Sequence, residues 1–365
     1  MPTKPVEGRQ QEVGVAHPML LAAGNRRFDL AEQLLFRFER QLNPVADEVS
    51  ALTAVVRPIL QGVLHALKTE VVGEVGGREQ VKLMMLPRLY RRGDGDCGIC
   101  FEYAVHDAIQ RHDSLVMERI VEALSKHCKI PGDNAASILF GAEKTGAVQL
   151  IETARERLTD ESQLLAGTRG RPVKLKKHID IVAAAFRKRS VQLLLPHSIS
   201  GLWKADLFVG FDDSDKWVGT SVKINQQHLE PARGLRVGIV PSTQGTSDSI
   251  RRDEQKNLIV CPLPHDGSFM EVFYRAWGIV QQFLFADGEM PKEVSLPMPS
   301  DRQVAKYLAE RRKFPVVDVI NALEPLAQPH LLETSELEVG VILRRPGFGT
   351  VGGVIAPFPA SGPKS

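Results

Sequence analysis

A β-hairpin encoded by residues 204–224 is the feature that most constrains how this chain can fold. Apolar residues alternate along 204–211 with the period of two that is typical of a strand with two different faces. After a polar turn rich in aspartate, a second strand is predicted over 216–224. The same period places Ser221 and Lys223 on one face of the second strand. The hairpin is therefore expected to bring this face next to Asp206.

An acid and a lysine that meet at one place point to a particular chemistry. In phosphodiester hydrolysis, carboxylates hold Mg²⁺, which acidifies the attacking water and neutralises developing charge. A nearby lysine orients or activates the nucleophile. The hairpin thus predicts a metal-dependent nuclease.

Asp206 followed by Ser221-Val222-Lys223 resembles the motif of the restriction-endonuclease-like, PD-(D/E)xK nuclease superfamily. The resemblance covers roughly residues 98–285. It implies an α/β fold with a restriction-endonuclease-like core, a mixed central sheet flanked by helices, and here additional N-terminal and inserted helices. The implied order is a helix, three antiparallel strands, a helix and a fourth strand. The expected elements are a helix near 98–112, strands near 190–196, 204–211 and 216–224, a short helix near 226–233 and a strand at 235–240.

Two residues depart from the family pattern. Ala205 replaces the usual proline, and Ser221 replaces the acid that would bind metal. A carboxylate must then come from elsewhere. Glu102, which matches a glutamate on the first core helix of many members, is the preferred candidate. Glu230 on the following helix is the alternative.

The resemblance implies a role for each site residue. Asp206 and the second acid are metal ligands, the backbone carbonyl of Val222 is a possible further ligand, and Ser221 belongs to the catalytic group. Lys223 positions water or stabilises the transition state. The cofactor is Mg²⁺, for which Mn²⁺ can substitute, and the substrate is DNA. A homodimer is expected because cleavage of two strands commonly needs two active sites, and a role in restriction or defence follows from the family alone.

The charge of the chain is close to balanced, at +2. A global basic field for nucleic acid is therefore absent, and any such surface must be local. Between 169 and 189 there are eight Lys and Arg residues against one acid. The DNA-binding candidates in this segment are Arg169, Arg171, Lys174, Lys176 and Lys177.

The residues Arg169-Gly-Arg-Pro172 also resemble the core of an AT-hook, whose arginines enter the narrow minor groove of A·T-rich DNA. The alternative is a basic solvated linker before a helix over 176–189. Either arrangement can contact phosphate.

The cysteines allow two other interpretations. Cys97 and Cys100 form a single CxxC, for which Cys128 and His127 are the nearby candidates to complete a zinc site. Asp94-Gly-Asp-Cys97, at the start of an apolar helix, resembles the nucleophile segment of the OTU cysteine proteases. That class also requires a downstream histidine.

A catalytically inactive nuclease fold that binds DNA or assembles complexes is a further alternative, because Ser221 replaces an acid. The absence of an apolar run of about 18 residues and of a signal-peptide core predicts a cytoplasmic protein without a membrane span. The expected organisation is disorder over 1–17, a helical region over 18–92 with helices at 29–42 and 45–67, and the core over 93–290. A helical insertion is expected over about 129–175, with helix over 133–165, then a helical region over 291–334 and a flexible tail over 335–365.

Overall fold

The computed structural model describes twelve parts of the chain: residues 35–37, 44–90, 96–140, 157–165, 172–174, 176, 205–232, 234–243, 247–265, 268–286, 296–327 and 340–342. The chain divides into two compact units, 1–41 with 336–365, and 42–335. In the first unit, β1 (Leu35–Arg37) pairs antiparallel with β10 (Gly340–Ile342). The larger unit contains the candidate site.

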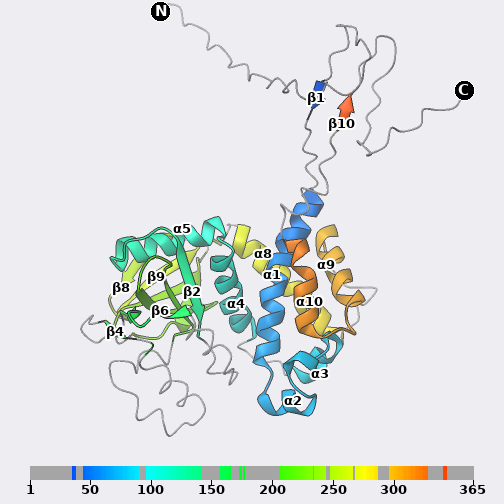
Figure 1. Ribbon diagram of the computed structural model, residues 1–365, viewed down its shortest axis with the longest axis horizontal. Helices are drawn as coiled ribbons and strands as arrows, with labels where there is room; N and C mark the ends of the chain where they lie inside the picture. The colour runs from blue at the N-terminus through cyan, green and yellow to red at the C-terminus, as the bar shows by residue number, and fades with distance from the viewer. Residues whose placement is uncertain are drawn as a thin grey trace, which may run out of the picture. The chain divides into compact units, whose positions relative to one another are not determined.

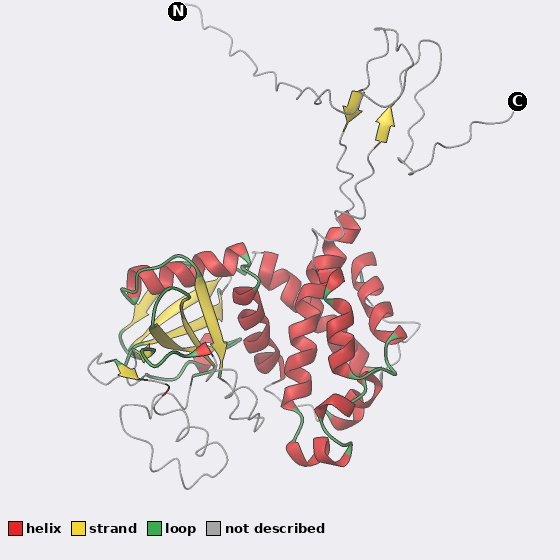
Figure 2. Cartoon of the chain, viewed as in Figure 1, coloured by secondary structure: helices red, strands yellow, loops and turns green. Residues whose placement is uncertain are grey.

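An eight-stranded mixed sheet lies at the centre of one half of the larger unit (Figures 1 and 2). Its main path runs, in spatial order, through β2 (Ala135–Leu139), β5 (Leu207–Phe211), β6 (Lys216–Val222), β7 (Arg236–Pro241), β9 (Leu258–Leu263) and β8 (Arg251–Asp253). Off this path, β3 (Gln163–Leu164) pairs with β6 and with β4 (Val173–Lys174). Strand β5 is antiparallel to both of its neighbours, β2 and β6, whereas β6, β7 and β9 are parallel.

The hairpin of β5 and β6 forms as the sequence predicts, with Leu207 opposite Thr220. Gly210 is required where the two strands approach most closely, because a Cβ at this position would lie 2.6 Å from the backbone oxygen of Lys216. The alternating pattern gives each strand two faces. Leu207, Val209 and Val222 belong to the main hydrophobic core.

The helices cover the sheet and form a bundle beside it (Figure 1). Their bounds are α1 (Pro44–Ala66), α2 (Thr69–Glu74), α3 (Leu86–Leu89), α4 (Asp96–Gln110), α5 (Ser114–Glu122), α8 (Ser268–Phe285), α9 (Pro299–Glu310) and α10 (Val316–Leu323). Helices α4 and α5 pack against the sheet, and α1 packs against α4, α8, α9 and α10. Helix α4 therefore joins the bundle to the sheet.

Helix α1 lies at the centre of this bundle, and most of its side chains are apolar. Its residues Asp47–Ala66 are long and apolar enough to span a membrane, the one such stretch in the part of the chain that the structure describes. Yet 72% of that stretch is buried inside the molecule. The apolar surface is thus used in packing between helices.

Several expected elements are confirmed, including the helices α1 and α4 and the strands β5, β6 and β7. Two helix predictions are wrong where the structure describes them. Leu35–Arg37, inside the helix expected at 29–42, is strand β1, and Ala135–Leu139, inside the helix expected at 133–165, is strand β2. The interval 129–175 therefore contributes three short strands to the sheet.

The same finding changes which segment supplies the first core strand. The strand beside β5 is β2, and the strand expected at 190–196 lies outside the described residues. The helix expected at 226–233 is reduced to one 3₁₀ turn at Gln226–His228. The tail expectation is wrong at Gly340–Ile342, which is strand β10. The disorder expected over 1–17 and the helix expected over 176–189 fall outside the described residues, apart from Lys176.

Candidate active site

Three of the predicted site residues meet at one ammonium group. Asp206 directly precedes β5, Lys223 directly follows β6, and Glu102 lies in the middle of α4. The Nζ of Lys223 donates hydrogen bonds to Oδ2 of Asp206 at 2.7 Å and to Oε1 of Glu102 at 3.2 Å. The hairpin supplies the first pair, and the packing of α4 against β2 and β6 supplies the second acid.

The backbone of the hairpin holds Asp206 in place. The N–H of Val222 donates to Oδ2 of Asp206 at 2.9 Å, and the N–H of Asp206 donates to the carbonyl of Thr220. The aspartate is therefore fixed against the strand from which Lys223 follows. Ser221 is buried in the same strand and lies opposite Gly238 of β7.

The two acids are almost completely buried, whereas the lysine reaches solvent. The side chains of Glu102 and Asp206 are 4% and 10% exposed, and that of Lys223 is 25% exposed. Burial disfavours the charged lysine, but the charges and hydrogen bonds of both acids outweigh it, so that the pKa of Lys223 is raised above its ordinary 10.5. Lys223 is a cation at neutral pH.

Arg236, which the sequence interpretation missed, adds a second cation whose charge interacts with that of Asp206. It begins β7 and is only 5% exposed. Burial lowers the pKa of Arg236, while the charges of Asp206 and Glu230 oppose this effect. A single arginine at the start of an apolar strand was the available signal. Glu230, the alternative second acid, is exposed, and its charge interacts with Arg236. The second acid that contacts Lys223 is Glu102.

The arrangement partly meets the needs of a metal ion. Among the residues that the structure describes, no three His, Cys, Asp or Glu side chains gather to hold one. Mg²⁺ nevertheless often uses one or two carboxylates and keeps several water ligands. Two carboxylates that converge on one cation fit this mode, provided that Lys223 moves aside.

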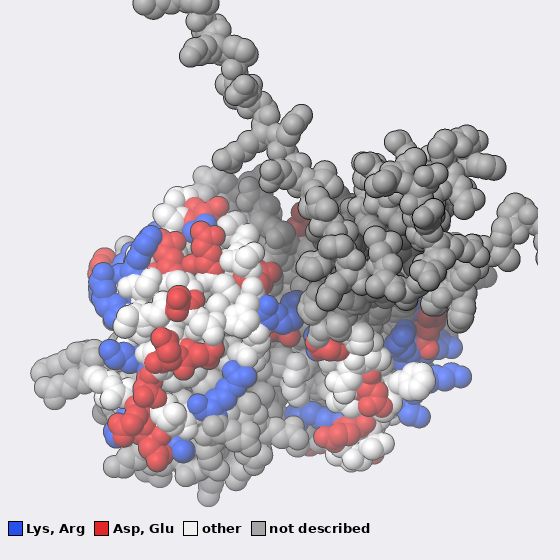
Figure 3. Space-filling model, turned by 45° about the horizontal axis from the view of Figure 1, so that its top comes forward, with Lys and Arg blue, Asp and Glu red and all other residues white. Residues whose placement is uncertain are grey.

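The basic segment is less open than its sequence suggests. Lys174 pairs with Glu161 at 3.1 Å, and Lys176 pairs with Asp160 at 3.1 Å. Arg169, Arg171 and Lys177 lie outside the described residues. On the face drawn in Figure 3, acidic and basic side chains are interspersed. A continuous phosphate-binding surface remains a prediction.

The cysteine alternatives gain little from the geometry. Cys100 is buried with its Sγ 3.7 Å from the carbonyl of Ile59, and burial raises the pKa of Cys128 to about 12. Among the described residues, no three His, Cys, Asp or Glu side chains gather to hold a metal ion, so the zinc alternative has no support in the geometry. Cys97 lies in the first turn of α4. The pKa of Tyr274 is raised mainly because this residue is partly buried, and secondly by its electrostatic interaction with Cys97.

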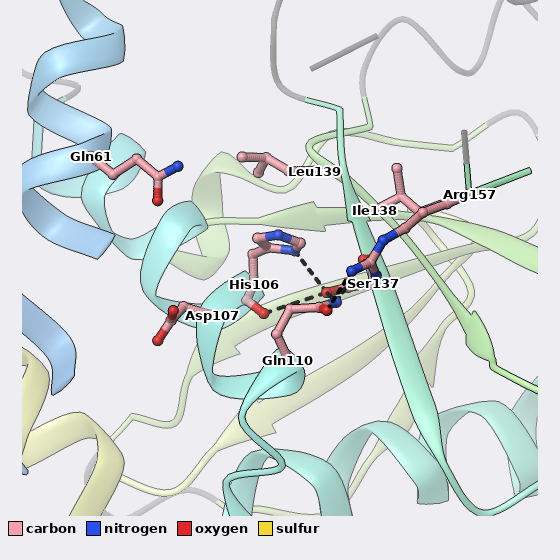
Figure 4. Close-up of a pocket in the computed structure, with 8 residues that line it drawn as sticks. All are labelled: Gln61, His106, Asp107, Gln110, Ser137, Ile138, Leu139 and Arg157. Carbon is pink, nitrogen blue, oxygen red and sulfur yellow. Dashed lines mark hydrogen bonds between the residues drawn. The ribbon is translucent and has the colours of Figure 1, made fainter. Parts of the chain in front are cut away.

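A pocket of about 220 Å³ opens one turn further along α4 (Figure 4). It is lined by Gln61, His106, Asp107, Gln110, Ser137, Ile138, Leu139 and Arg157. Nδ1 of His106 lies 2.8 Å from Oγ of Ser137. Burial first, and then the charge of Arg157, lower the pKa of His106 to about 4.

Comparisons with protein-family models, with curated proteins and with solved structures find no match to this chain. The functional argument therefore rests on the geometry of the Glu102, Asp206 and Lys223 group.

Proposed function

We propose that the protein is a Mg²⁺-dependent DNA endonuclease with a restriction-endonuclease-like core. The observation that supports this most strongly is the joint contact of Lys223 with Asp206 and Glu102. These three residues come from segments far apart in the chain, and they are the acid, second acid and lysine that the motif implies. A salt bridge made only for stability would not require two nearly buried acids around one lysine.

The order of elements supports the same core. Helix α4 precedes the antiparallel strands β2, β5 and β6, and β7 then joins parallel to β6. This is the order that the family resemblance implies, with one 3₁₀ turn at Gln226–His228 where a helix was expected.

Asp206 and Glu102 would hold Mg²⁺ or Mn²⁺, with the backbone carbonyl of Val222 as a possible further ligand. When bound, the ion acidifies water and neutralises charge on the phosphate. Lys223 is protonated at neutral pH, so it acts as a hydrogen-bond donor to phosphate oxygens or to the attacking water and not as a general base. Ser221 stands where the family motif usually has an acid.

Cleavage of supercoiled plasmid tests this proposal. The protein is expected to nick or linearise DNA with Mg²⁺ or Mn²⁺, and to lose this activity in excess chelator. Cys97→Ala is the matched variant for the cysteine-protease alternative, and it should cleave as the wild type does. Hydrolysis of an isopeptide substrate that depends on Cys97, without nuclease activity, would favour the alternative.

A catalytically inactive, DNA-binding or assembly protein is the second candidate. Ser221 in place of an acid favours it, because Lys223 already pairs with both remaining carboxylates. DNA binding without cleavage under all metal conditions would select this candidate. The homodimer is proposed from the cleavage of two strands, and the role in restriction or defence from the family resemblance. The cytoplasmic location is proposed from the sequence, in which no signal-peptide core was found.

A further inference from the structure

The pocket beside His106 lies on the same helix as the proposed metal site. His106 follows Glu102 by four residues, which is one helical turn and about 6 Å of rise. Gln110 continues the same face of α4 by another turn. Side chains at this spacing point to one side of a helix, so the pocket and the carboxylate group are neighbours.

The pocket wall is fixed by a hydrogen-bonded group around Ser137. The amide nitrogen of Gln110 donates to the carbonyl of Ser137 at 2.9 Å and to its Oγ at 3.3 Å. Arg157 donates to the Oε1 of Gln110 at 2.9 Å and to the carbonyl of Ser137 at 3.4 Å. These bonds use two of the five N–H groups of the guanidinium. Among the described residues no other acceptor is bonded to it, so three N–H groups can donate to solvent or to a ligand.

His106 adds a donor to the pocket. The hydroxyl of Ser137 has one proton and two possible acceptors on His106, Nδ1 at 2.8 Å and the backbone carbonyl at 3.5 Å. We assign the hydroxyl proton to the shorter contact, with Nδ1 as acceptor, and in this tautomer the hydrogen of the neutral ring is on Nε2. Figure 4 shows this second ring nitrogen turned away from Ser137, toward the space between Gln61 and Leu139.

The one acid in the lining is already balanced. Asp107 pairs with Arg111 at 2.5 Å and its charge also acts on Arg57. The groups directed at the pocket are thus the guanidinium of Arg157, the Nε2–H of His106 and the amide of Gln61. Donors and a net positive charge suit an oxyanion.

We propose that this pocket binds a phosphate of the nucleic-acid strand, next to the phosphate that a metal ion on Glu102 and Asp206 would hold. The proposal rests on the proposed nuclease function for the identity of the strand. One helical turn between the two sites is comparable with the separation of neighbouring phosphates along a strand. The pocket would therefore fix the register of the substrate without taking part in the chemistry.

Calorimetric binding of thymidine 5′-monophosphate, thymidine and inorganic phosphate tests the pocket. Excess chelator removes any metal, so that the carboxylate site cannot attract the probes. The nucleotide should bind more tightly than either thymidine or phosphate, and Arg157→Gln should weaken its binding by about tenfold or more, the effect of a lost charged hydrogen bond. Lys306→Gln, which removes an equal charge from an exposed position on α9, should bind as the wild type does.

His106 provides an independent variant pair. His106→Gln retains an N–H donor near the position of Nε2 and should bind the nucleotide more tightly than His106→Leu. Melting temperatures of both variants identify any loss through unfolding. In plasmid cleavage, Arg157→Gln should raise KM while kcat changes little, because the residue acts in binding.

Equal nucleotide binding by Arg157→Gln and the wild type would overturn the proposal, as would an equal loss in Lys306→Gln. Inorganic phosphate that binds as tightly as the nucleotide would make this a free-anion site and would overturn the assignment to a strand. A different result would refute the nuclease proposal but not the phosphate pocket. In that case the wild type would not cleave DNA, while nucleotide binding that depends on Arg157 would persist, including in Asp206→Asn.

Discussion

At the scale of single residues, the ammonium of Lys223 lies between two acids whose negative charges need a cation nearby. Asp206 and Glu102 are buried and both bond to it. Without it, two carboxylates would lie close together with little solvent to screen them, although the charge of Arg236 also interacts with Asp206. Two buried acids make the stability of the fold depend on a cation, and under the proposed function the same acids would bind the metal.

Lys223→Met tests this dual role. Loss of the ammonium should destabilise the fold by about 3 kcal/mol, because it leaves two buried acids with less compensating charge. Mn²⁺ should then raise the melting temperature of Lys223→Met more than that of the wild type, since the metal no longer competes with lysine. Melting curves with and without Mn²⁺ give the answer. An identical response of both proteins would argue against a metal between Glu102 and Asp206.

Ser221 gives a second test at this scale. Ser221→Glu restores an acid at the usual position of the motif and should retain or raise cleavage. Glu102→Gln should then reduce the cleavage rate more in the wild type than in the Ser221→Glu background. The double-mutant cycle measures this coupling. Equal losses in both backgrounds would mean that an acid at position 221 does not take over the role of Glu102, and no loss in the wild type would mean that Glu102 has no part in catalysis.

At the scale of elements, the contribution of β2 to the sheet explains how α4 is held over the site. The N–H of Phe140 donates to the carbonyl of Asp206, and His106 and Gln110 of α4 contact Ser137 in the same strand. The strand thus links the hairpin to the helix that bears Glu102.

Gly132, just before β2, provides the test of this arrangement. It has φ of +144°, and a Cβ there would collide with the ring of Phe211 on β5. Gly132→Ala should therefore destabilise the protein by about 2 kcal/mol or more. Gly98→Ala is the matched change in α4, where no atom lies within 4 Å of the added carbon, and it should stabilise by about 0.5–1 kcal/mol. Urea unfolding compares the two, and similar effects would contradict the position of β2.

The hairpin and α4 could be predicted from sequence because their patterns are local. The alternation around Asp206 and the apolar spacing after Cys97 each specify one element. Strand β2 could not be predicted in this way. Its sequence AASIL is short, buried throughout and rich in alanine, so only pairing with β5 makes it a strand. Arg236 was missed for a related reason, since its proximity to Asp206 depends on the pairing of β6 with β7.

At the scale of the whole molecule, two buried histidines make the fold sensitive to acid. Burial and nearby arginines lower the pKa of His65 and of His106 to about 4, from an ordinary value of 6.5. The unfolded chain therefore binds more protons than the fold between these values. Each histidine contributes stability above pH 6.5 that is lost as the pH falls toward 4, at most about 3 kcal/mol each.

His65→Asn tests this pH dependence, because its amide can replace the Nδ1 contact with the hydroxyl of Tyr103, 2.7 Å away in the wild type. The melting temperature of the variant should fall less steeply between pH 6.5 and pH 4 than that of the wild type. A parallel decline in both proteins would assign the acid sensitivity to carboxylates elsewhere.

The central claim, that Asp206 is a ligand of a catalytic metal, is tested most directly by Asp206→Asn. The asparagine retains an oxygen that can accept from the N–H of Val222, so the fold should persist while the charge of the ligand is lost. Asp213→Asn, an exposed acid in the turn of the same hairpin, is the matched control. We predict that Mg²⁺-dependent plasmid cleavage by Asp206→Asn falls by about a hundredfold or more, with a folded melting curve and with Asp213→Asn unaffected. Cleavage at the wild-type rate by a folded Asp206→Asn protein would contradict the account.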